Sequence, residues 1–142
     1  MTSEELIHRF ESGEVAEDSF HHADHVRLAF AYLSRYSALE ALDKFSNALR
    51  RYAAARGKPQ RYSETITYAY FFLIRERVAR SGRVDWDEFA RRNPDLLAWK
   101  DGILTRYYEE ATLQSDLARR LFLFPDKLCS SLCYSSLEAK KR

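Results

Sequence analysis

The stretch FHHADHVRLAFAYL, residues 20–33, decides the fold, because a cluster of polar residues leads directly into an apolar run. Three of the four histidines of the chain lie within its first six residues. The residues after Arg27, from Leu28 to Leu33, are almost wholly apolar. This pattern predicts a helix whose first turn holds a polar site and whose remainder lies in the core.

A second stretch, RYSETITYAYFFLI at residues 61–74, has the same layout of polar residues followed by apolar ones. Ser63 is a favourable N-cap for a helix that continues to about residue 80. Its middle is apolar on every side, which predicts a second central helix. We expect the two helices to lie together, with their polar first turns facing one another.

The other patterns predict further helices and no strands. Amphipathic spacing or capping pairs indicate helices over residues 2–12, 37–56, 85–92 and 95–108, and another from Ser115. Gly 4 and Pro 3 in 142 residues are few, which disfavours a turn-rich β fold. The sequence therefore predicts an all-α, single-domain bundle of about six or seven helices. The domain is expected to span residues 1–126, and residues 127–142 to form a tail or a short helix.

Charge and hydropathy exclude several classes of function. The net charge is +2, from 23 basic and 21 acidic residues, which gives no general attraction to nucleic acid or to an anionic membrane. The apolar runs are too short to span a bilayer, and the first residues do not resemble a signal peptide. Cys129 and Cys133, four residues apart, are expected to be reduced thiols. We expect a cytoplasmic protein.

His22 and His25 are the first candidate site residues. A spacing of three residues on a helix places both imidazoles on one side, within reach of one metal ion or one substrate. His21 and His25, four residues apart, would serve nearly as well. Imidazole is a common metal ligand and the usual general base near neutral pH. In the alternative, one histidine caps the helix and another donates to a buried carbonyl.

Glu64, Tyr68 and Arg27 complete the predicted site. Glu64 lies in the first turn of the second central helix among hydroxyl-bearing residues that include Tyr68. A buried hydroxyl without a partner costs about 1–3 kcal/mol, so these groups are expected to pair with the carboxylate, the histidines or a ligand. Arg27 would clamp a carboxylate or phosphate of that ligand, or form a structural ion pair with Glu64.

These residues resemble a group of small uncharacterised bacterial helical proteins. In that group a segment (W/F)-(T/H)-H-x-x-H-(L/V) is followed by Y-H-E-T-(I/L)-T, and this chain has FHHADHV and, about forty residues later, YSETIT. The resemblance implies that His22 and His25 are the paired positions and that Glu64 belongs with them. Ser63 stands where the group has a third histidine, which weakens the case for tight metal binding.

The pattern predicts a small-molecule enzyme or ligand-binding protein with a His/Glu/Arg pocket between the two central helices. Its chemistry would be acid–base or metal-assisted, as a tailoring step in secondary metabolism. A divalent transition metal would be held by His22, His25 and Glu64. A second hypothesis is a non-catalytic partner subunit, in a homo- or heterodimer, whose polar cluster is structural. A third is a metal-binding or sensing module.

Overall fold

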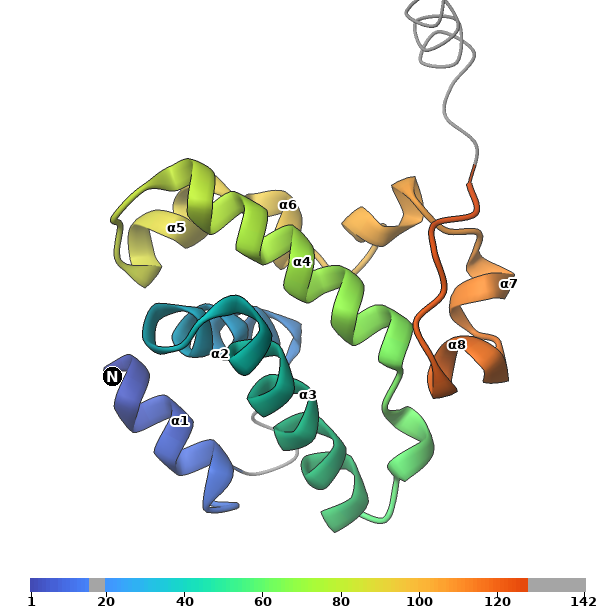
Figure 1. Cartoon of the computed structure of the whole chain (residues 1–142), viewed down its shortest axis with the longest axis horizontal. Coiled ribbons are helices and arrows are strands. Elements are labelled where there is room, and N and C mark those ends of the chain that lie inside the picture. The colour runs from blue at the N-terminus through green and yellow to red at the C-terminus, as the bar shows by residue number, and fades with distance from the viewer. Residues whose placement is uncertain (16–19, 128–142) are drawn as a thin grey trace, which may run out of the picture.

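The computed structural model describes residues 1–15 and 20–127 and is all-α, with no strand among these residues (Figure 1). The prediction of the fold class is confirmed. Five helices have seven residues or more; η2 lies between the third and fourth of them, and the other short elements come after the fifth. The elements in order are α1 (Ser3–Glu11), α2 (His22–Arg35), α3 (Ala38–Ala55), η2 (Pro59–Arg61), α4 (Glu64–Ser81), α5 (Trp86–Arg92), α6 (Pro94–Leu97), η3 (Ile103–Arg106), α7 (Glu110–Leu113) and α8 (Asp116–Arg120).

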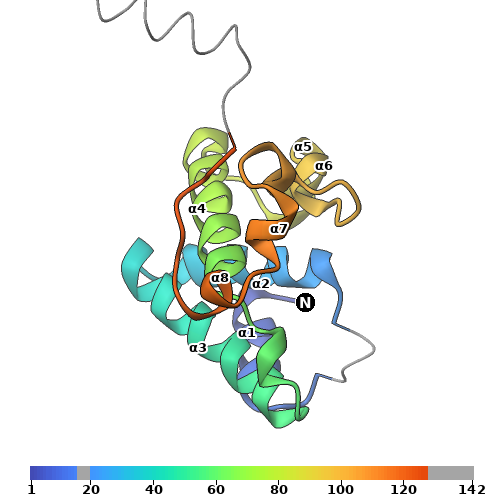
Figure 2. The same ribbon diagram turned by 90° about the vertical axis from the view of Figure 1, so that its right-hand side faces the viewer.

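Helix α2 lies at the centre of the molecule, as the opening stretch predicts. It packs against α1, α3 and α4, which surround it in both ribbon views (Figures 1 and 2). Leu28, Ala29 and Tyr32 of this helix are fully buried. The Tyr32 hydroxyl donates to Glu11 Oε1 at 2.7 Å, which ties α1 to α2. Burying a large apolar side chain stabilises the folded protein by about 1.5–3 kcal/mol, so the buried residues of α2 form a main part of the core.

Helix α4 begins where predicted but is buried on one side only. The Ile66 amide donates to Ser63 Oγ at 3.2 Å, so Ser63 is the N-cap. Phe71 and Ile74 are buried, whereas the side chain of Phe72 is 44% exposed. The apolar residues in the middle of this helix are therefore not all buried. The reason is that α4 covers α2 and α3 with one face, while the opposite face has only partial cover.

The helix expected over residues 95–108 is interrupted. Helix α6 ends at Leu97, and a turn precedes η3. Asp101 in this turn has φ 52°, a left-handed conformation that stops a right-handed helix and that aspartate adopts more readily than most residues. Gly102 follows, and a Cβ built there would lie 2.9 Å from the Tyr70 hydroxyl. The turn is thus packed directly against α4, and it brings Trp99 to the site described below.

The segment after α8 runs beside α4 (Figure 2). The hydroxyl of Thr65, which is fully buried, donates to the Leu121 carbonyl at 2.8 Å and accepts from the Leu123 amide at 3.0 Å. The Lys127 amide donates to the Tyr107 carbonyl at 3.0 Å, so residue 127 is still attached to the fold. The rest of the predicted tail and both cysteines lie outside the described residues. None of the described helices has the length and hydropathy needed to cross a membrane.

Candidate functional site

His22 is held at the start of α2 by contacts with two other parts of the chain. Its Nε2 lies 2.8 Å from the Leu96 carbonyl oxygen. Because a carbonyl only accepts hydrogen bonds, Nε2 carries the proton, and Nδ1 of the neutral ring is an acceptor. The ring meets that of Tyr70 edge-on at 4.8 Å and that of Trp99 at 5.2 Å. Burial lowers the pKa of His22, and the hydrogen bond to Leu96 opposes that shift.

His25 lies one turn further along α2 and is neutral at physiological pH. Its ring packs on that of Phe20 with centroids 4.4 Å apart. Burial is the main reason that its pKa is lowered to about 4; the positive charge of protonated His22 acts in the same direction, and Asp24 acts in the opposite direction. Asp24 also accepts from the His21 amide at 2.9 Å, which fixes the first turn of the helix.

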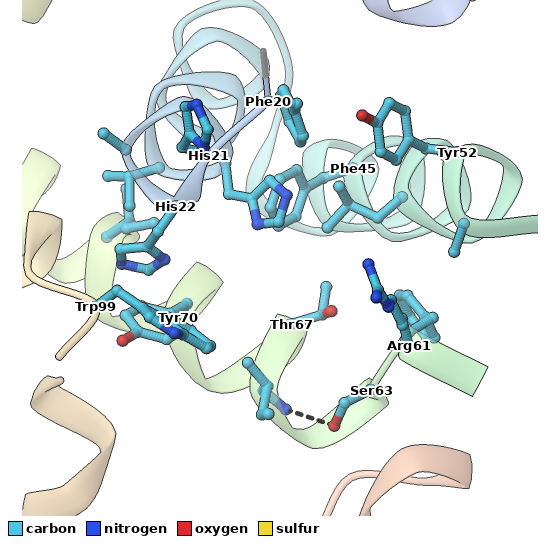
Figure 3. Close-up of a pocket in the computed structure, with 18 of the residues that line it drawn as sticks. Phe20, His21, His22, Phe45, Tyr52, Arg61, Ser63, Thr67, Tyr70 and Trp99 are labelled. Carbon is cyan, nitrogen blue, oxygen red and sulfur yellow. Dashed lines mark hydrogen bonds between the residues drawn. The ribbon is translucent and has the colours of Figure 1, made fainter. Parts of the chain in front are cut away.

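Both histidines line a pocket of about 680 Å³ between α2, α3, η2 and α4, bounded also by Leu97 and Trp99. In the close-up, His22, Tyr70 and Trp99 lie together at one end, and Arg61 lies at the other (Figure 3). A volume of this size is typical of sites for organic small molecules. The lining residues are Phe20, His21, His22, Ala23, His25, Val26, Phe45, Leu49, Tyr52, Ala53, Arg56, Lys58, Arg61, Tyr62, Ser63, Ile66, Thr67, Tyr70, Ile74, Leu97 and Trp99.

Helix α4 contributes one regular face to this pocket. Its lining residues are Ser63, Ile66, Thr67, Tyr70 and Ile74. They stand at positions i, i+3, i+4, i+7 and i+11, so they lie on one side of the helix. Burial raises the pKa of the Tyr70 phenol to about 12, so this group is a neutral hydroxyl at the histidine end of the pocket.

The structure does not place Glu64 among the residues that line this pocket. Its carboxylate lies outside the pocket lining and is held by the Arg50 guanidinium and by the Tyr62 hydroxyl, the latter at 2.7 Å. The Arg50 guanidinium also lies over the Tyr62 ring at 4.8 Å. These contacts join α3 to the start of α4. In the structure Glu64 therefore links α3 to the start of α4 and does not line the pocket with the histidines.

Arg27 and Tyr68 are also placed elsewhere. The Arg27 guanidinium donates to the Met1 carbonyl at 2.9 Å and lies 5.9 Å from the Trp86 ring, beside a smaller pocket of about 330 Å³. The ring of Tyr68 stacks on that of Phe122 with centroids 6.0 Å apart. Neither residue lines the pocket with the histidines, and the ion pair expected between Arg27 and Glu64 is not formed.

The three expected metal ligands are not brought together. Within residues 1–15 and 20–127, no three His, Cys, Asp or Glu side chains are grouped so that they could hold a metal ion. His22 and His25 share the pocket, but Glu64 is paired with Arg50. Two imidazoles without a third ligand are too few for either a structural or a catalytic zinc site.

Sequence reasoning missed the basic residues of the pocket. Arg56, Lys58 and Arg61 line it from the end of α3 and from η2. They surround the Gly57–Pro59 turn, so a cluster of positive charge at that turn was a signal available in the sequence. Tyr70 could also have been predicted as a pocket residue, because it lies seven residues after Ser63 and so on the same face of α4.

Comparison of the chain with protein-family models, curated proteins and solved structures finds no match, so the chemistry of the site is argued from its own residues.

Proposed function

We propose that the protein binds an organic small molecule in the pocket between α2, α3 and α4, and that its activity there is acid–base chemistry. The observation that supports this most strongly is the placement of His22 and His25 in the wall of a pocket of about 680 Å³. Drug-sized and metabolite-sized ligands occupy sites of this volume. The wall is otherwise mostly apolar and aromatic, with a small number of polar groups that would orient a ligand.

The two imidazoles have complementary roles in this proposal. His22 donates through Nε2 to Leu96, which fixes its ring. His25 makes a ring contact with Phe20 and is uncharged at neutral pH, so a nitrogen lone pair is available to accept a proton. A histidine that burial keeps uncharged at neutral pH is suited to accept a hydrogen bond or a proton. We assign His25 the role of base, and His22 and Tyr70 that of positioning groups.

The test is a thermal-shift and ligand-observed NMR screen of aromatic fragments against matched variants. Leu49→Trp places a large ring in the pocket, because Leu49 is one of its lining residues. Leu39→Trp is the control, since Leu39 is on the same helix and is 73% exposed. Ala53→Phe is a second pocket variant in case the first unfolds. We expect fragments to bind wild type and Leu39→Trp, and not the two pocket variants. Equal binding to folded Leu49→Trp and folded Ala53→Phe would refute the proposal.

A non-catalytic partner subunit is the second candidate, and one observation favours it. Exposed aromatic and aliphatic side chains lie along the outer side of α4 and α8. Tyr68 stacks on Phe122, and the Phe122 ring meets that of Phe124 at 5.7 Å. The side chain of Phe124 is 83% exposed, and that of Phe72, one turn from Tyr68, is 44% exposed. Sedimentation equilibrium of wild type and Phe124→Ser tests this candidate, since a dimer through this surface would be weakened by the substitution.

A further inference from the structure

Trp99 is an exposed aromatic residue in the wall of the pocket. It is 64% exposed, although tryptophan has the largest apolar side chain. Other large apolar residues in the described part of the chain are exposed, such as Leu39 and Phe124, but Trp99 alone among them lines this pocket. Single exposed apolar residues are common on protein surfaces. An exposed tryptophan beside a pocket, in contrast, has ring surface that a bound ligand would cover.

The turn that carries Trp99 is attached to the rest of the fold on both sides of this residue. Three residues before it, the fully buried Leu96 accepts a hydrogen bond from His22 Nε2 at 2.8 Å through its carbonyl oxygen. Three residues after it, Gly102 packs so closely on α4 that a Cβ there would lie 2.9 Å from the Tyr70 hydroxyl. These contacts fix the backbone around Trp99. A residue that is held in place before binding loses less conformational freedom when a ligand covers it.

Three rings meet at this end of the pocket, and we call them the aromatic wall: those of His22, Tyr70 and Trp99 (Figure 3). The His22 ring meets the Tyr70 ring edge-on, with centroids 4.8 Å apart and 61° between the ring planes. It lies 5.2 Å from the Trp99 ring at an angle of 45°. Burial lowers the pKa of His22, so the imidazole is neutral at pH 7. The aromatic wall is therefore uncharged at that pH.

An aromatic wall distinguishes a flat aromatic ligand from an aliphatic one. Ring pairs that are stacked with an offset or meet edge-to-face attract one another more than burial of the same apolar area would predict. The two ring pairs of the wall already have the centroid distances that such pairs prefer. An aliphatic body of the same carbon skeleton gains only from the burial of its apolar surface. The wall therefore favours a planar aromatic body.

We propose that the ligand of this pocket is a planar aromatic molecule whose ring system stacks on Trp99 beside His22 and Tyr70, and that Trp99 is the residue that selects it. This inference rests on the proposed function, because it assigns a ligand class to the same pocket. It also gives the ligand a position. Its ring system lies at the end of the pocket formed by the aromatic wall, one helical turn from His25, the residue assigned the role of base.

The test compares two uncharged probes that share one carbon skeleton and one hydroxyl group. The first is 2-naphthalenemethanol, which is flat and aromatic, and the second is its decahydro analogue, which is neither. Titration calorimetry on the full chain at pH 7 should show the aromatic probe binding about fivefold more tightly than the saturated one. The saturated probe has the larger apolar surface, so a pocket that selected by burial alone would bind it at least as tightly.

Matched variants locate the preference at Trp99. Trp99→Leu should bind the aromatic probe about fivefold more weakly than wild type and lose the preference, whereas Trp99→Phe should keep part of it. Phe124→Leu removes a ring that is 83% exposed and does not line the pocket, and it should leave the preference unchanged. Trp99→Leu should unfold at nearly the same temperature as wild type, because Trp99 is mostly exposed. A large decrease would show that Trp99 supports the fold, and would overturn its assignment as a binding residue.

The indole N–H signals give a second readout by NMR. The chain has two tryptophans, so the two signals are assigned with Trp99→Phe. The Trp99 signal should shift when the aromatic probe is added, because a stacked ring changes the local magnetic field. The signal of Trp86, which is on α5 and does not line this pocket, should stay in place. A Trp99 signal that does not move while the probe binds would overturn the stacking.

The outcomes separate the ligand class from the pocket. Equal affinity of wild type for the two probes, with both lost in Leu49→Trp, would overturn the aromatic ligand class and leave the pocket as a binding site. A preference for the aromatic probe that survives in Trp99→Leu would overturn the role of Trp99. Binding of both probes that persists in folded Leu49→Trp and folded Ala53→Phe would overturn the pocket itself. No binding of the aromatic probe up to its solubility limit would overturn the ligand class.

Discussion

The buried position of His25 makes the stability of the protein depend on pH in a calculable way. The pKa of His25 is about 4 in the folded protein against 6.5 for an ordinary histidine, chiefly because burial disfavours its charged form. Between these two values the unfolded chain binds a proton that the folded chain does not. Stability is therefore fully present above pH 6.5 and falls as the pH is lowered toward 4.

The magnitude follows from the same two values. Between pH 7 and pH 5, proton uptake by His25 in the unfolded chain lowers the free energy of unfolding by about 2 kcal/mol, and by about 3 kcal/mol if the pH is taken to 4. Protonation of His22, whose pKa is also lowered, changes stability in the same direction. Asp24 acts against this effect, because its negative charge favours protonation of His25.

The assay is urea unfolding of wild type and His25→Gln at pH 7, 6 and 5. Glutamine retains hydrogen-bonding groups and does not titrate, so the variant should lose about 2 kcal/mol less than wild type between pH 7 and pH 5. His8→Gln, at an exposed position of α1, is the matched control and should follow wild type. If wild type and His25→Gln lose the same free energy over this range, His25 titrates as an exposed residue, and its assignment as a buried neutral base is refuted.

Two further substitutions test how the walls and the turn are held. Thr65→Val removes a hydroxyl that is hydrogen-bonded to Leu121 and Leu123, and should lower the free energy of unfolding by about 2 kcal/mol. Thr65→Ser keeps the hydroxyl and should lower it by about 1 kcal/mol or less. Equal losses in the two variants, measured by urea unfolding, would contradict this. Gly102→Ala should cost about 1–3 kcal/mol because its Cβ meets the Tyr70 hydroxyl at 2.9 Å. The loss on thermal unfolding should be smaller in a Tyr70→Phe background, and full additivity would show that the contact is not the cause.

The central helices were predictable because their signals are local. The apolar run after Arg27 and the cap at Ser63 each lie within one element, and the structure has both helices where those signals place them. The interrupted helix after Pro94 was not predictable, because the left-handed Asp101 and the close approach of Gly102 to Tyr70 depend on packing between distant segments.

The candidate site was predictable in part for the same reason. His22 and His25 share a face because of their spacing alone. Arg27 is two residues after His25 and points in a different direction from it, toward Met1 and Trp86. Glu64 is different: its partner Arg50 lies on α3, and no pattern in the sequence indicates which cation a carboxylate will meet across two helices.

The most direct test of the pocket as the binding site is an NMR titration of the histidine imidazole signals, with an aromatic fragment that binds wild type in the screen as the probe. We expect the signals of His22 and His25 to shift together and to saturate with the same dissociation constant, while that of His8 on α1 does not move. If His22 and His25 remain unchanged at concentrations where the probe is bound, and signals of the exposed aromatic surface around Phe124 shift in their place, the pocket is not the binding site and the central claim is wrong.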